Sequence, residues 1–192
     1  LDDNSKSGMM KDLAATQAAI RGLEGFQGAN LSDAQRLNLD VILYSLGQQT
    51  VAPGTFGLNS VQRPYRIFQQ GGSYFRVPDF LNTAHTINDS ADCDAYVARL
   101  DAFARNLRTD TALQRDEAAR GYLAPAWSLD LTLGQLKKLR GQPAAQSSMV
   151  QSLVKRASAK GISGDWQAQA TGVVEKAIYP ALDEQIAAIE AL

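Results

Sequence analysis

The chain has 192 residues, a mass of 20.7 kDa and a formal net charge of −1. Hydrophobic residues make up 45% and charged residues 20%, which is ordinary for a globular protein and excludes disorder as the main state. The near-zero net charge argues against nucleic-acid binding, and the longest apolar run, 41–46, is far shorter than the roughly 18 residues of a membrane span.

Helical periodicity begins near the N-terminus. Apolar residues recur at helical spacing in the first part of the chain, and we expect this helix to end at Gly25 or Gly28. Ser32 and Gln35 have the spacing of a capping box and predict the start of a second helix. We expect the second helix to end by Gly47.

The stretch 48–72 is rich in glycine and proline and predicts an irregular connection, with room for one short helix at 65–70. A connection of this length is unusual in a compact domain and is often functional. Several of its apolar residues need burial, so we expect a packed loop and not a free linker. They are Phe56, Leu58, Tyr65, Ile67 and Phe68.

Helical patterns resume at Pro78, which suits the first turn of a short helix. The most regular pattern lies between Tyr96 and Leu107 and predicts one long helix, or two with a break near Asp110. Further helices follow, and Pro180 is expected to kink or split the last one. No strand pattern is present, so the sequence predicts an all-α fold of about seven or eight helices in an irregular bundle, with one long irregular connection.

No shift in composition marks a second domain. We therefore expect 1–192 to be a single helical domain, or the N-terminal lobe of a larger chain. The chain begins with Leu1 and not with Met, and its last residues form a helical pattern without a stop signal. We expect both ends to be cut ends, with Leu192 inside a helix.

Common catalytic motifs are absent, including phosphate-binding loops, nucleophile elbows and the HExxH zinc motif. Ser152 and Lys155 match the SxxK pattern of serine acyl-enzymes, but the partner motifs are missing and a solvated helix face is the favoured interpretation. The chain has one cysteine, Cys93, and one histidine, His85, which excludes an intrachain disulfide and a zinc site of clustered Cys and His ligands.

Four side chains are candidates for a binding surface, and none is assigned a catalytic or metal-binding role. Arg120, Tyr122 and Trp127 cluster around a Gly/Pro break, and such groups on loops are common in binding sites. The alternative is that Tyr122 and Trp127 simply seal the core. His85 could act as a base with Asp89 one helical turn on, but a lone histidine at a helix end is more often a cap or a satisfied buried group.

From about Phe56 to Leu192 the sequence resembles the N-terminal half of a large bacterial family, domain-of-unknown-function family 885. No single motif carries the resemblance, which rests on the order and spacing of several segments. They are FGL at 56–58, AHTI at 84–87, DAYVARL at 94–100, RGYLAP at 120–125 and IYPAL at 178–182.

Members of that family resemble helical zinc metallopeptidases. The resemblance implies a complete protein about three times as long, with a zinc-binding HExxH helix in its C-terminal half. It implies no cofactor in this chain, because zinc is expected only with that missing half. It also implies a periplasmic or cell-envelope location, since many members carry export signals; a cytoplasmic location stays open.

The resemblance further implies that these helices form one wall of a substrate cleft and are not catalytic by themselves. His85, Arg120, Tyr122 and Trp127 are then candidates for contact with a peptide substrate. The expected partner is the C-terminal half of the same parent chain. The alternative function is a self-standing helical module that binds a protein or peptide, or acts as a scaffold.

Overall fold

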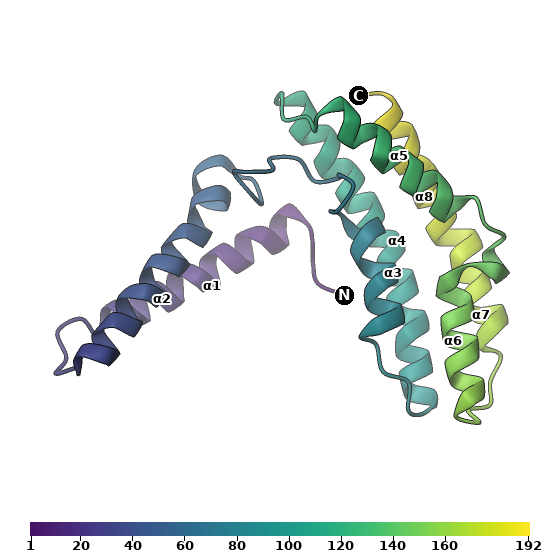
Figure 1. Ribbon diagram of the computed structural model, residues 1–192, viewed down its shortest axis with the longest axis horizontal. Helices are drawn as coiled ribbons and strands as arrows, with labels where there is room; N and C mark the ends of the chain where they lie inside the picture. The colour runs from purple at the N-terminus through teal and green to yellow at the C-terminus, as the bar shows by residue number, and fades with distance from the viewer. The chain divides into compact units, whose positions relative to one another are not determined.

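The computed structural model describes all 192 residues and confirms the all-α prediction (Figure 1). Its only extended pairing is an isolated bridge between Phe68 and Gly71. The chain divides into two compact units, Asp2–Pro64 and Tyr65–Leu192, and Leu1 groups with the second.

The first unit is a helical hairpin of α1 (Lys6–Glu24) and α2 (Asp33–Val51). The predicted capping box is present, because Ser32 Oγ accepts from the Gln35 N–H at 3.3 Å and Gln35 Oε1 accepts from the Ser32 N–H at 2.9 Å. The hairpin buries few large side chains, chiefly Leu13 of α1 and Leu39 of α2.

The predicted end of α2 at Gly47 is wrong. A helix tolerates one internal glycine at a cost of about 1 kcal/mol, and α2 continues to Val51 and then through a π-helical turn at Ala52–Phe56. The irregular connection therefore occupies 57–72 and not 48–72, and it contains no short helix at 65–70. Leu58 and Ile67 are buried as expected, whereas Phe56 is exposed.

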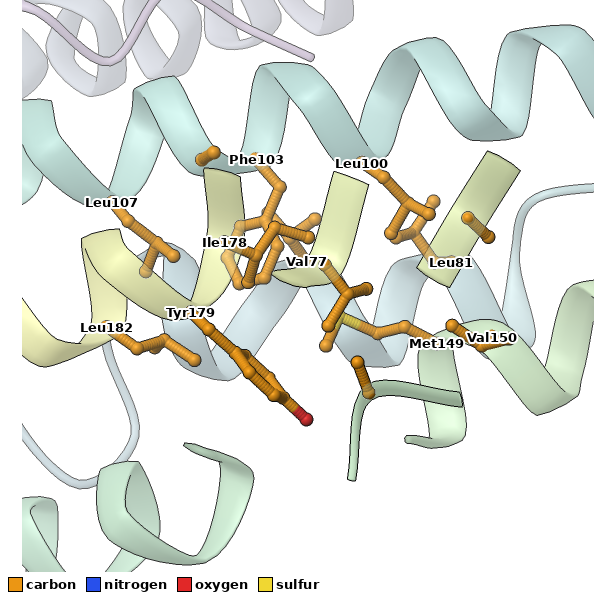
Figure 2. Packing of buried hydrophobic residues seen from close by; sticks show 14 of the residues in the cluster. Val77, Leu81, Leu100, Phe103, Leu107, Met149, Val150, Ile178, Tyr179 and Leu182 are labelled. Carbon is orange, nitrogen blue, oxygen red and sulfur yellow. The ribbon is translucent and has the colours of Figure 1, made fainter. Parts of the chain in front are cut away.

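The second unit is a bundle in which α4 packs against α3, α6, α7 and α8 (Figure 1). Figure 2 shows the core, to which Phe103 of α4, Met149 of α6 and Ile178 contribute, and each of these side chains is almost completely buried. Burial of each such side chain contributes roughly 1.5–3 kcal/mol. The helices are α3 (Ser73–Thr83), α4 (Ser90–Ala119), α5 (Ala126–Arg140), α6 (Ser148–Ala159), α7 (Trp166–Val173) and α8 (Tyr179–Glu190).

Helix α3 begins at Ser73, so Pro78 lies inside it and not in its first turn. The cap is supplied by a distant residue: the Ser73 N–H donates to Asp110 Oδ2 of α4 at 2.6 Å. A side chain 37 positions further along the chain gives no local signal, which is why the sequence misplaces this helix start.

Helix α4 is a single helix of 30 residues without a break at Asp110. The expected interruption near Pro180 is present as a π-helical turn at Val174–Ile178, which joins α7 to α8. There the Tyr179 N–H bonds to the Val174 carbonyl, five residues back, so the helical run continues past a proline that lacks an N–H.

Candidate functional site

Three of the four candidate side chains lie at the turn between α4 and α5. Helix α4 ends at Ala119 with Arg120 as its C-cap, and Gly121 follows with φ of 84°, a left-handed conformation that glycine adopts without strain. The Gly121 N–H bonds to the Ala118 carbonyl and the Tyr122 N–H to the Glu117 carbonyl, both at 2.9 Å. These two backbone hydrogen bonds form a Schellman motif, which fixes the direction in which the chain leaves α4.

Arg120 and Tyr122 form a stacked pair at this turn. The guanidinium carbon of Arg120 lies 5.1 Å from the centre of the Tyr122 ring, and its Nη1 lies 3.8 Å from Asp116. Such cation–π contacts stabilise by about 0.5–1 kcal/mol at exposed sites. The pair therefore presents one cation and one half-buried aromatic ring in a defined arrangement.

Trp127 does not seal the core, because 61% of its surface is exposed. It lies in the first turn of α5, and Leu131, four residues further along the helix, is exposed at the spacing of one helical face. Leu123, in the turn before α5, is exposed as well. We call Arg120, Tyr122, Leu123, Trp127 and Leu131 the α4–α5 surface. It combines a cation, two aromatic rings and exposed aliphatic groups, the composition of a site for an extended or helical peptide.

His85 lies far from this surface, beside the opposite end of α4, a helix about 45 Å long at about 1.5 Å per residue. It is buried, and both ring nitrogens have partners: Nε2 lies 2.9 Å from the Asp92 carbonyl oxygen and Nδ1 lies 2.6 Å from Arg99 Nη1. Its ring meets that of Tyr96 edge to face. Burial lowers the pKa of His85, assisted by the charges of Arg99 and Arg156, so a neutral structural role fits this position.

A row of buried polar side chains on α4 was not predicted from the sequence. Asp110, Gln114 and Glu117 are spaced by four and three residues, so they share one face of the helix. They hold the segment 66–73, which we call the strap. The Ile67 N–H donates to Gln114 Oε1 at 2.8 Å, and the Arg66 guanidinium pairs with Asp110 at 2.9 Å.

Glu117 is the least satisfied member of this row. It accepts a hydrogen bond from the Arg66 backbone, but its Oε2 is buried without a partner. Burial raises the pKa of Glu117 to about 7, against the opposing effects of that hydrogen bond and of the Arg66 and Arg120 charges. Glu117 is thus a carboxyl group that changes its charge near neutral pH, and it lies in the last turn of α4, just before the α4–α5 turn.

A signal for this row does exist in the sequence. The apolar stripe of α4 runs through Phe103 and Leu107, and continuing its spacing leads to Asp110, Gln114 and Glu117. Polar residues at stripe positions indicate buried hydrogen-bonding groups, but the sequence does not show which distant segment they bind.

The other chemical candidates have structural explanations. The Ser152 hydroxyl accepts from Arg156 at 3.5 Å, while Lys155 is exposed. Cys93 is completely buried, and burial raises the pKa of its thiol, with the neighbouring aspartates adding to the effect. No group of three or more His, Cys, Asp or Glu side chains in the chain could hold a metal ion, so these residues do not fit a zinc site.

The whole chain matches one known protein family. The family described as "Bacterial protein of unknown function (DUF885)" matches residues 1–192. The chain belongs to this family. The match includes the α1–α2 hairpin, which lies before the segments that carry the resemblance in the sequence.

A solved structure also resembles this DUF885 chain, the protein described as "the putative lipoprotein from Colwellia psychrerythraea". The TM-score is 0.84 at 18% sequence identity, over 98% of this chain, which establishes a shared fold. The DUF885 chain spans only 34% of the length of that protein. No curated protein matches, and no helix is long and apolar enough to cross a membrane.

Proposed function

We propose that this chain is a helical lobe of a longer DUF885 protein that hydrolyses peptides with a zinc ion, and that the lobe forms one wall of the substrate cleft. Membership of the family and the threefold greater length of the structural relative support this proposal. The zinc ligands belong outside this chain, whose own residues do not fit a metal site. The envelope location is part of the same proposal, in line with a relative described as a lipoprotein.

The α4–α5 surface is the observation that carries the proposal. The turn carries a stacked Arg–Tyr pair, and the helix that follows it begins with an indole exposed over most of its area; both are suited to a peptide backbone and its side chains. Arg120 would bind a carboxylate or a carbonyl oxygen of the substrate, and Trp127 would cover an apolar side chain. His85 is not part of the proposed wall, because its side chain is buried and both ring nitrogens already have hydrogen-bond partners.

The test uses the complete gene product and an assay of peptide hydrolysis. Because the wall binds substrate without touching the reacting bond, Trp127→Ala and Arg120→Ala should each raise KM by about tenfold, or about 1.4 kcal/mol, and leave kcat unchanged. Asp101→Asn, on an exposed part of α4, is the control and should change neither value. Unchanged kcat/KM in both wall variants would refute the proposed wall, and hydrolysis that survives a chelator would refute the zinc chemistry.

The alternative function, a self-standing binding or scaffold module, is favoured by the number of exposed apolar residues outside the α4–α5 surface. The two functions differ in the intact mass of the native product. A mass near 20.7 kDa would favour the binding module, and a mass about three times larger would favour the lobe.

A further inference from the structure

Helix α2 carries two apolar faces on opposite sides. Leu39, Leu43 and Leu46 are its most buried large side chains, and they form the face turned toward α1. At about 100° per residue, Leu37, Val41 and Tyr44 point in the opposite direction. A helix that is apolar on both sides is normally covered on both sides.

The second face, which we call the outer face of α2, is not covered within the α1–α2 hairpin. Tyr44 is 71% exposed, Leu37 63% and Val41 58%, and Val51 continues the face toward the end of the helix. The successive spacings of four, three, four and three residues, with Gln48 as the polar member, are those of a coiled-coil seam. This spacing selects another helix as the partner.

A lipid surface and a second copy fit the outer face less well. An interfacial membrane helix carries Lys and Arg on its polar face, whereas α2 has a single Arg and two Asp. A stable dimer buries roughly 1,600 Å² in total, which one row of four side chains on a 19-residue helix does not provide. A helix of the same polypeptide needs far less area, because its effective concentration is high and the entropy of association is already lost.

We infer that the outer face of α2 is the docking site for an amphipathic helix from the further part of the complete protein. The structural relative supplies the source of such a helix, because it shares 98% of this chain and has about two thirds of its own length outside the match. The inference rests on the proposed function in one respect only, that the native protein is longer than this chain.

Cysteine labelling tests the inference, because the single native cysteine, Cys93, is buried and serves as an unreactive background. Tyr44→Cys reports on the outer face, and Gln17→Cys, at an exposed position of α1, is the matched control. Leu37→Cys replaces Tyr44→Cys if that variant fails to fold. Each variant is treated with a maleimide in the 192-residue chain and in the complete protein, and the labelled peptide is quantified by mass spectrometry.

We expect residue 44 to label at least about tenfold more slowly in the complete protein, and residue 17 to label equally fast in both. Equal rates at residue 44 would overturn the inference. Slow labelling already in the 192-residue chain would also overturn it, and its dependence on concentration would identify a second copy as the cover. Labelling requires no catalysis, so a protected residue 44 in a protein without peptide hydrolysis would refute the proposed function and leave this docking site standing.

Discussion

Glu117 makes the stability of the bundle depend on pH in a direction opposite to that of a typical carboxylate. Its side chain is buried, with only 7% of the residue exposed, and its pKa rises from 4.5 to about 7 on folding. The unfolded chain therefore ionises at lower pH than the folded chain. The contribution of Glu117 to stability is fully present below pH 4.5 and is lost as the pH rises through about 7.

The two pKa values give the size of this effect. Between pH 5 and pH 8 they correspond to a loss of roughly 2–3 kcal/mol in the free energy of unfolding. Glu117→Gln keeps the shape and the acceptor for the Arg66 backbone but cannot ionise. We therefore expect this variant to gain roughly 2–3 kcal/mol relative to the natural protein when the pH is raised from 5 to 8.

Urea unfolding followed by circular dichroism at several pH values measures this difference. Glu175→Gln, at an exposed glutamate of the same unit, is the matched control. The reasoning is refuted if the difference between natural protein and Glu117→Gln is the same at pH 5 and pH 8. That result would mean that water or local movement solvates the carboxylate.

Three further predictions concern single side chains of the bundle. Asp110→Asn should lower the free energy of unfolding by about 3–5 kcal/mol, because it breaks the buried ion pair with Arg66. Asp101→Asn, in an exposed pair, should cost less than about 0.5 kcal/mol, and urea unfolding separates the two variants. Trp127→Ala should cost less than about 0.5 kcal/mol and Trp166→Ala about 3–5 kcal/mol, since Trp166 is buried, and equal losses would contradict the exposures described above. In an NMR titration, the pKa of His85 should lie below the usual value of 6.5 for histidine. The stability that the neutral ring confers should be present above pH 6.5 and should decline as the pH falls. A normal or raised pKa would show that the ring is solvated.

Local rules account for most of the fold. The capping box at Ser32 and the Gly121 turn are formed by residues within a few positions of each other, and both are predictable from the sequence. The errors arise where a distant residue decides. The start of α3 depends on Asp110, which caps it from α4. The end of α2 is a different, local error, because the helix tolerates Gly47 and continues past it.

The candidate site was predictable only as a group of residue types. The Gly/Pro break identifies Arg120, Tyr122 and Trp127 as neighbours, because they are close in sequence. It does not show that Trp127 is exposed, which depends on how α5 packs against α8. His85 is separated from them because α4 is one straight run of 30 residues, a length that the stripe pattern left open.

The weak interior of the α1–α2 hairpin has a consequence for how the chain opens. The hairpin buries few large side chains, and the strap fastens the chain to the bundle from Arg66 onward, so the hairpin can unfold while the bundle stays intact. In the 192-residue chain its backbone amides should exchange with deuterium far sooner than those of α4. The hairpin would then be a separate cooperative unit, and its stability would depend on whether another helix packs on the outer face of α2.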